Sequence, residues 1–127
     1  MPLNKKTIII LVISLVIIVL GSVLLVKSSN TSGKYDSFAS CLKEKGANFY
    51  GAFWCPHCRS QKKLFGKSAD LLPYIECSTP DGNSQLQECT DKGIESYPTW
   101  TFSDDSRENG ELTLEKLAEK TSCQLPE

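Results

Sequence analysis

A pair of cysteines between an apolar run and a helical pattern constrains the fold of this chain more than any other feature. Cys55 and Cys58 are separated by Pro56 and His57, and they directly follow the apolar run of residues 47–54. A short apolar run of this kind is typical of a buried strand, and the residues after the pair show helical periodicity. The pattern predicts a strand that delivers two thiols to a helix N-terminus, which is the layout of a thiol–disulfide exchange site.

The two cysteines are expected to play different roles because they occupy different positions on the helix. Cys55 would stand at the N-cap, where unpaired backbone N–H groups and the helix dipole favour a thiolate, so it is predicted to be the exposed nucleophile. Cys58, one turn later, would be the shielded resolving cysteine. Pro56 suits the first helical position. His57 can stabilise the Cys55 thiolate, which makes the disulfide more oxidising.

Two other interpretations of the motif stay open. A CxxC sequence can be half of a zinc site, whose second half would have to come from residues such as Cys77 and Cys89, and His57 inside the motif also suits copper or zinc. The pair could instead form an inert structural disulfide. We favour redox chemistry, with no resident metal and no cofactor other than the Cys55–Cys58 disulfide itself.

The charge composition limits the partners of the chain. Its 127 residues carry a formal net charge of −1, which gives no reason to expect binding to nucleic acid. Positive charges do gather on the helix after the motif, where a solvated helix face is favoured over tuning of the thiolate. The residues concerned are Arg59, Lys62, Lys63 and Lys67.

Residues 7–26 form a second informative stretch, because twenty residues pass without a charge. A helix of this length, at about 1.5 Å per residue, would be about 30 Å long and would match the hydrocarbon core of a bilayer. A cleaved signal peptide has the same basic start, but this run is longer than the usual apolar region, and residues 26–29 offer no small-residue cleavage site. We therefore predict an uncleaved transmembrane signal anchor, preceded by a short tail of residues 1–6.

The orientation of this anchor depends on charge and on cysteine content. Lys5 and Lys6 favour a cytoplasmic N-terminus, whereas Lys27 and Lys34 weaken that bias. Six cysteines in so short a chain fit an oxidising compartment, so we expect the following domain outside the cytoplasm, in a periplasm or at the outer face of the cell membrane. Residues 27–34 are polar and Ser-rich, which indicates a flexible tether of about 15 Å.

Residues 35–127 show the pattern of one α/β domain. The order of elements predicted from periodicity and turn residues is helix, strand, helix, strand, helix, strand, strand, helix. In the helix that follows the cysteine pair, we expect Leu64 and Phe65 to face inward. The expected strands are residues 47–53, 72–77, 98–102 and a short fourth strand after 107, and the expected helices are 36–46, 58–65, 83–92 and one capped by Thr113.

The cysteine motif and the segment Ser96-Tyr97-Pro98-Thr99 together resemble the thioredoxin superfamily, over about residues 35–122. The tetrapeptide CPHC is like that of the disulfide-forming DsbA group. The longer string YGAFWCPHC…KKLFG…LPYIECS…QECTDKGIESYPTW is similar to the thioredoxin-like domain associated with bacterial and plant vitamin K epoxide reductase (VKOR) homologues. This resemblance implies a thioredoxin fold, a central mixed β-sheet flanked by helices, here preceded by a single transmembrane helix.

The resemblance also implies roles for residues outside the motif. Trp54, Tyr97 and Pro98 would bind substrate, with a cis peptide bond before Pro98 that leaves backbone open beside Cys55 for a substrate strand. In one respect the sequence departs from the family. Phe49 stands near the position at which many thioredoxins carry a buried acid, and its absence disfavours reductase action because the resolving thiol lacks a local base.

The remaining cysteines are expected to brace the domain. The VKOR-associated domains have a similar second pair, which implies a Cys77–Cys89 disulfide worth about 3 kcal/mol on a chain-entropy model. We expect it to be structural rather than a redox relay. Cys41 and Cys123 then remain, and a bridge between them would contribute about 4.5 kcal/mol on the same model. If they are free, one of them can pair with another chain instead.

The expected function is that of a membrane-anchored thiol–disulfide oxidoreductase. It would introduce disulfides into reduced, cysteine-containing secreted proteins through a mixed disulfide at Cys55. A VKOR-like or DsbB-like, quinone-linked membrane oxidoreductase would then restore the Cys55–Cys58 disulfide. The alternative is electron flow in the other direction, as a reductase or isomerase, for example in cytochrome c maturation. The rival from another class is a copper- or zinc-binding module.

Overall fold

The computed structural model describes residues 4–26 and 32–127, and it divides into two compact units, residues 1–31 and 32–127. The first unit contains helix α1, Lys5–Val26, with 22 residues. Its segment Lys5–Ser22 has a mean hydropathy of 2.2 and is not buried. By length and composition α1 is therefore a candidate membrane span, a criterion that signal sequences also meet. The predicted tail and tether lie partly outside the described residues.

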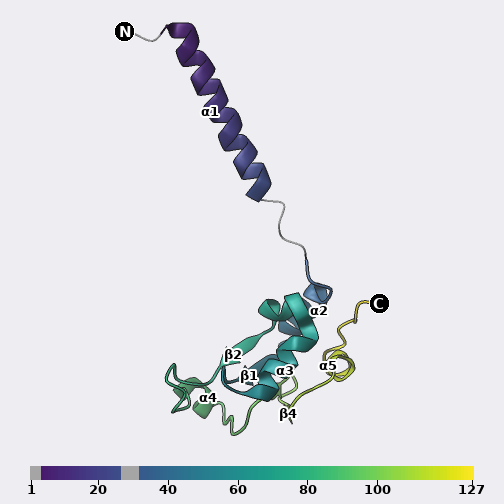
Figure 1. Ribbon diagram of the computed structural model, residues 1–127. Helices are drawn as coiled ribbons and strands as arrows, with labels where there is room; N and C mark the ends of the chain where they lie inside the picture. The colour runs from purple at the N-terminus through teal and green to yellow at the C-terminus, as the bar shows by residue number, and fades with distance from the viewer. Residues whose placement is uncertain (1–3, 27–31) are drawn as a thin grey trace. The chain divides into compact units, whose positions relative to one another are not determined.

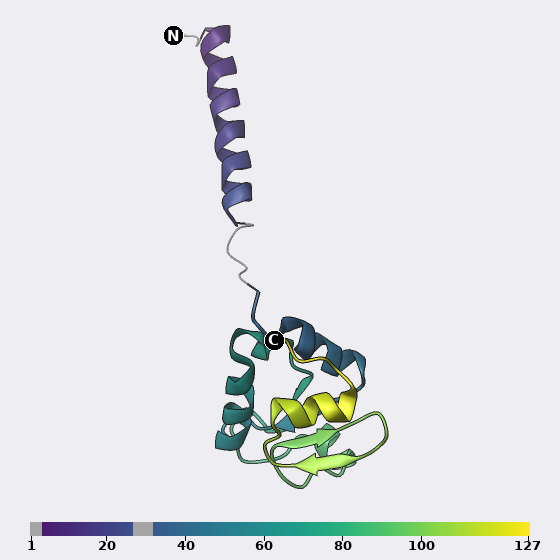
Figure 2. The ribbon, with the colours of Figure 1, turned by 90° about the vertical axis from the view of Figure 1, so that its right-hand side faces the viewer.

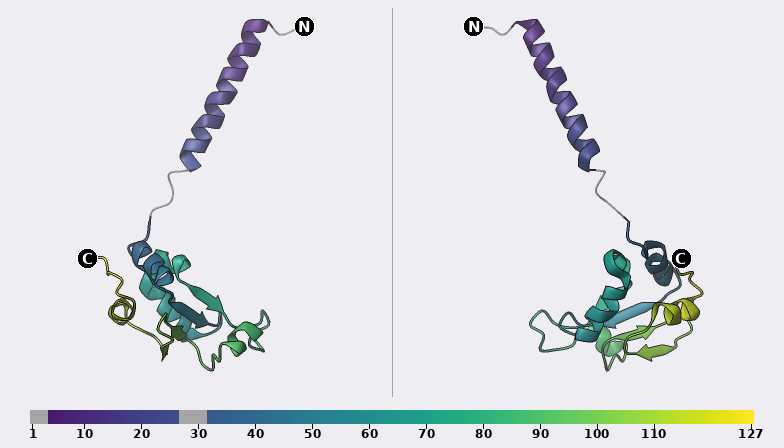
Figure 3. Two further views of the ribbon diagram at one scale, coloured as in Figure 1. Left: turned by 180° about the vertical axis from the view of Figure 1, so that it is seen from behind. Right: turned by 45° about the vertical axis from the view of Figure 1, so that its right-hand side comes forward.

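A four-stranded mixed sheet with the order β2-β1-β3-β4 forms the centre of the second unit (Figure 1; Figure 3). Strand β1, Asn48–Gly51, pairs in parallel with β2, Tyr74–Glu76, and antiparallel with β3, Thr99–Thr101. Strand β3 pairs antiparallel with β4, Arg107–Asn109. The predicted mixed sheet in an α/β domain is confirmed, and β1, β2 and β3 are shorter than the predicted strands 47–53, 72–77 and 98–102.

Helices cover both faces of this sheet. Because neighbouring residues on a strand point to opposite faces, Phe49 belongs to the main core cluster while Tyr50 belongs to a smaller one on the other side. The main cluster takes side chains from α2 (Asp36–Glu44), α3 (Pro56–Phe65) and α5 (Leu114–Thr121), and the smaller one includes Cys89 of α4 (Gln87–Asp91). Figure 2 shows α5, in yellow, beside the hairpin of β3 and β4. A short 3-10 helix, η1 (Gly66–Leu71), follows α3.

The inward face of α3 differs from the prediction in one residue. Phe65 is buried as expected, but Leu64 is 42% exposed, so its predicted burial is wrong. Gln61 is fully buried in its place, on the same helix face as Phe65 and Cys58. Its amide Nε2 donates to the carbonyl of Leu112 at 2.9 Å, and its Oε1 accepts from the N–H of Leu112 at 2.7 Å. This buried site tolerates an amide because both polar atoms of the amide are hydrogen-bonded.

Two disulfides join segments that are distant in the sequence. Cys41 of α2 is bonded to Cys123, which follows α5, across a separation of 82 residues. Cys77, directly after β2, is bonded to Cys89 of α4 across a separation of 12 residues. The first links the beginning and the end of the second unit, and the second fixes the loop between β2 and α4.

Candidate redox site

Cys55 and Cys58 are free thiols at the start of α3. Cys55 is the N-cap residue, and its Sγ accepts a hydrogen bond from the backbone N–H of Cys58 at 3.2 Å, with Pro56 in the first helical turn. The Sγ of Cys58 lies 2.7 Å from that of Cys55 and donates to it. This exceeds the covalent S–S length of about 2.05 Å, so the site is a dithiol. Two donors, the backbone N–H and the thiol of Cys58, thus face the sulfur of Cys55.

The predicted exposure of Cys55 is wrong. Cys55 is 3% exposed and Cys58 2%, and both belong to the main core cluster. The physical reason is a tight turn, in which the N–H of Cys55 donates to the carbonyl of buried Ala52 at 3.0 Å. Hydrogen bonding, rather than exposure, therefore distinguishes the two thiols. Burial and the bond to Cys55 raise the pKa of Cys58 to about 12.

Two of the three residues expected to bind substrate, Trp54 and Tyr97, lie next to this pair. Tyr97 packs against the core cluster that contains both cysteines, and its peptide bond to Pro98 is cis. Trp54 is 47% exposed and meets Tyr97 edge-on, with ring centroids 5.9 Å apart. Its Nε1 donates to the hydroxyl of Ser78 at 2.9 Å. A hollow of about 210 Å³ opens beside these rings, with lining from Gly82 and the residues after it.

His57 is 70% exposed and pairs with a residue that the sequence analysis did not identify. Its Nδ1 lies 2.6 Å from Oε1 of Glu111, in the segment between β4 and α5. In the described part of the chain, the imidazole thus bonds to a carboxylate and not to the sulfur of Cys55. Glu111 is 54 residues from His57, so no local pattern indicates the contact.

Glu76 is a second acidic residue at the site that the sequence analysis missed. Its carboxylate accepts from the backbone N–H groups of Phe53 at 3.2 Å and Ser78 at 2.9 Å, and from the hydroxyl of Tyr74 at 2.8 Å. Glu76 is aligned with Gly51 in the parallel ladder. It therefore ties the loop that leads into the cysteine motif to the end of β2.

The position near which many thioredoxins carry an acid is apolar in the structure. Phe49 is fully buried and stacks on Trp100, with centroids 4.8 Å apart. The ring of Tyr74 meets Phe49 edge-on at 5.1 Å. Burial, and then its bond to Glu76, raise the pKa of Tyr74, so this phenol is a neutral donor.

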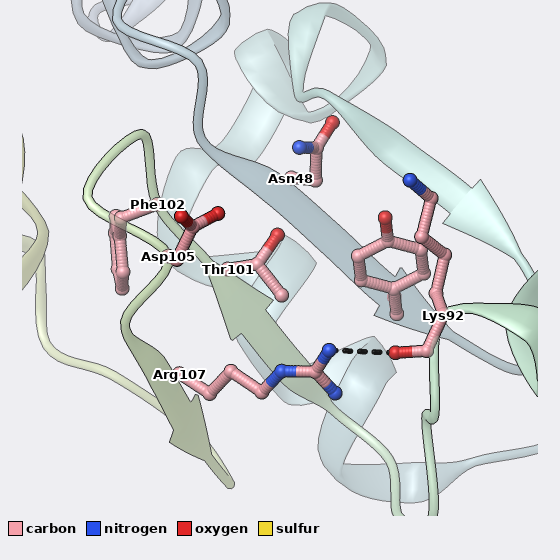
Figure 4. Close-up of a pocket in the computed structure, with 7 residues that line it drawn as sticks. Asn48, Lys92, Thr101, Phe102, Asp105 and Arg107 are labelled. Atoms are coloured by element: carbon pink, nitrogen blue, oxygen red, sulfur yellow. Dashed lines mark hydrogen bonds between the residues drawn. The ribbon is translucent and has the colours of Figure 1, made fainter.

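A larger polar hollow lies away from the cysteines, on the sheet face that carries Tyr50 (Figure 4). It has a volume of about 280 Å³, and Arg107 spans it by donating to the carbonyl of Lys92 at 2.6 Å. None of the predicted site residues lines it. Within residues 4–26 and 32–127, no cluster of three or more His, Cys, Asp or Glu side chains is arranged to hold a metal ion.

The sequence of the chain is similar to that of a protein whose name states thiol–disulfide chemistry. The chain is 43% identical over 103 residues to the thiol-disulfide oxidoreductase LTO1 of Arabidopsis thaliana, and the match covers 77% of this chain. The chain spans about a quarter of that relative's length, since 27% of the relative is matched. No family model matches the chain.

Proposed function

We propose that this chain is a membrane-anchored thiol–disulfide oxidoreductase of the thioredoxin fold that introduces disulfides into extracytoplasmic proteins. The observation that carries the proposal is the Cys55–Cys58 dithiol at the N-cap of α3. The β2-β1-β3-β4 sheet and the cis bond at Pro98 support the thioredoxin fold. The similarity to a relative named a thiol-disulfide oxidoreductase supports the chemistry.

The proposed reaction consists of two exchange steps. A substrate thiolate attacks Sγ of Cys55 in the oxidised protein, which forms a mixed disulfide and releases Cys58 as a thiolate. A second substrate thiolate then attacks the substrate sulfur of that mixed disulfide and releases Cys55 as a thiolate. The substrate loses two electrons and the Cys55–Cys58 pair gains them. The two substrate protons pass to Cys58 and, through solvent, to Cys55 or buffer.

The cellular setting is part of the proposal. Helix α1 would anchor the chain with its N-terminus in the cytoplasm, and the domain would lie outside. Two bonded cysteine pairs support an oxidising compartment, because structural disulfides persist there. A VKOR-like or DsbB-like, quinone-linked membrane oxidoreductase would reoxidise the dithiol, a partner suggested by the resemblance of the domain sequence.

A trapping experiment tests the catalytic role. The Cys58→Ser variant lacks the resolving thiol, so mixed disulfides at Cys55 should accumulate in cells and should be released by reductant. The Cys55→Ser/Cys58→Ser variant is the matched control and should capture nothing. Recovery of no covalent partner with Cys58→Ser would count against catalysis, and identification of the partners would name both substrates and the recycling enzyme.

A redox titration tests the direction of electron flow. The Cys55–Cys58 disulfide is equilibrated with glutathione buffers, and an oxidase should have a potential well above the value of about −270 mV that is typical of thioredoxin. A potential near that value would support the reductase or isomerase alternative instead. Copper or zinc bound stoichiometrically to the reduced protein in the presence of a chelator would favour the metal-binding module.

A further inference from the structure

The proposed reaction places a negative charge on a buried sulfur. When substrate attacks Cys55, the electron pair of the broken bond goes to Sγ of Cys58, which is 2% exposed. A leaving thiol with a high pKa leaves slowly, and burial followed by the bond to Cys55 raises the pKa of Cys58 to about 12. Phe49 offers this charge no polar group, and the backbone hydrogen bond from Ala52 is one interaction that favours it.

The ring of Tyr74 lies directly beside this sulfur. A methyl group placed on Gly51 would come within 2.8 Å of Tyr74 Cε2 and within 2.9 Å of Cys58 Sγ. The edge of the Tyr74 ring and the sulfur of Cys58 are therefore both in contact range of the same point above Gly51. The hydroxyl of Tyr74 donates to Glu76, and Phe49 meets the ring edge-on. The ring is therefore held in place from two sides.

One lysine of α3 makes a cation–π contact with this ring. Lys62 follows Cys58 by one helical turn, is half-buried, and places its Nζ 3.2 Å from the centroid of Tyr74. Its neighbours on the helix behave differently. Arg59 donates to the carbonyls of Phe53 and Trp54, while Lys63 is exposed.

We propose that Lys62, positioned by the Tyr74 ring, supplies the positive charge that stabilises the Cys58 thiolate as the Cys55–Cys58 disulfide opens. The inference rests on the proposed function, because it concerns a step of that reaction. The sequence analysis assigned Lys62 to a solvated basic helix face, and the inference gives this lysine a role of its own. On the reduced thiol, a backbone hydrogen bond from Ala52 and then the charge of Lys62 lower the pKa of Cys58, against the larger effects of burial and the bond to Cys55.

This role has a kinetic signature that a purely structural role lacks. In the reduced protein at neutral pH, Cys58 is a neutral thiol, so loss of Lys62 leaves the equilibrium between dithiol and disulfide nearly unchanged. In the opening step Cys58 carries negative charge, so the same loss slows the attack on Cys55. Loss of Lys62 should therefore slow the opening of the Cys55–Cys58 disulfide without changing the reduction potential of the pair.

The test measures how fast dithiothreitol reduces the oxidised full-length chain in detergent, by stopped-flow tryptophan fluorescence at pH 7. Lys62→Met keeps an apolar stem of similar length and removes the charge, and it should lower the second-order rate constant by about three- to tenfold. Lys62→Arg should restore most of the rate, and Lys63→Met, the matched control, should match the wild type. The potential of the Cys55–Cys58 pair should be the same in all four proteins.

Coupling to Tyr74 tests how the charge is positioned. In a Tyr74→Leu background no aromatic ring remains to hold the Lys62 ammonium in place, so Lys62→Met should have little further effect on the rate. A wild-type rate in Lys62→Met, or an equal loss in Lys63→Met, would overturn the inference while leaving the proposed function standing. Failure of the wild type to form a Cys55–Cys58 disulfide that dithiothreitol reduces would overturn both.

Discussion

The redox pair and the two bracing disulfides use cysteine in opposite ways. Cys55 and Cys58 are three residues apart within one helical turn, whereas the bracing pairs close loops with separations of 82 and 12 residues. The stabilisation by a disulfide grows with the length of the loop it closes. On this model the short loop of the local pair contributes less than either bracing loop, so opening the local pair removes the smallest constraint on the unfolded chain.

This contrast explains how one small domain can hold both kinds of bond. The pair that we propose cycles between dithiol and disulfide lies within one helical turn, so its bond would close only a short loop. The bonds that must persist join separate elements, Cys41 of α2 to the segment after α5, and the end of β2 to Cys89 of α4. Chemistry and stability should then be separable by mutation.

The largest expected effect is on chemistry. Cys55→Ser should lower disulfide exchange at least about a thousandfold, because a serine oxygen can form neither the disulfide with Cys58 nor a mixed disulfide with a substrate. Its free energy of unfolding should stay within about 1 kcal/mol of the reduced wild type, because serine is also a good N-cap residue for the N–H of Cys58. Stopped-flow exchange and urea unfolding measure the two effects. Substantial exchange in this variant would assign the chemistry to another cysteine.

Removal of the long-range pair should give the opposite result. In Cys41→Ser/Cys123→Ser, the free energy of unfolding should fall by about 4.5 kcal/mol, since a loop of about 83 residues is released in the unfolded chain. The rate of exchange at Cys55 should stay within about twofold of the wild type while the protein is folded. Urea titration of both proteins under non-reducing conditions measures the loss. An unchanged free energy of unfolding would mean that the Cys41–Cys123 disulfide does not stabilise the fold.

The second brace should have a smaller effect on stability. Cys77→Ser/Cys89→Ser should lose about 3 kcal/mol, measured in the same way. This pair lies nearer the site, because the N–H of Cys77 donates to the carbonyl of Gly51 and its neighbours Glu76 and Ser78 hold the motif loop. If the Cys77–Cys89 disulfide is purely structural, its removal should leave the reaction of Cys55 with dithiothreitol unchanged. A loss of that reaction in a folded variant would instead support a relay role.

The parts of the site that local patterns determine could be predicted from the sequence. The N-cap position of Cys55 and the first-turn position of Pro56 follow from the order of residues around one helix start. Thr113 caps α5 for the same reason, and its hydroxyl accepts from the N–H of Lys116 at 3.2 Å. These features depend on contacts between residues at most three apart.

The parts that depend on tertiary pairing could not be predicted. The parallel register of β1 and β2 sets Glu76 beside Gly51, and the approach of the β4–α5 segment to α3 brings Glu111 to His57. The amide of buried Gln61 is satisfied by the backbone of the same segment and by the indole N–H of Trp100. Composition and periodicity contain no information on such pairings, so polar groups that complete a site from distant segments were missed.

The smallest expected effect concerns Glu111, and it probes the redox pair without touching a cysteine. The sequence analysis predicts that His57 favours the Cys55 thiolate, and we expect the carboxylate of Glu111, 2.6 Å from its Nδ1, to offset that effect. Glu111→Gln should therefore stabilise the thiolate and make the disulfide more oxidising. An exposed pair contributes at most about 1 kcal/mol, which for two electrons corresponds to about 20 mV. Glutathione equilibration at pH 5.5, where a histidine is ordinarily charged, measures the shift.

Two controls locate the origin of that shift. Glu115→Gln removes an exposed carboxylate at the start of α5 and should leave the potential unchanged. In a His57→Ala background, Glu111→Gln should have no effect if the carboxylate acts on Cys55 through the imidazole. A shift that persists in that background would mean that Glu111 acts directly on the thiolate. A shift toward a more reducing potential would mean that the carboxylate's main effect is to hold the imidazole in its charged form, close enough to stabilise the Cys55 sulfur.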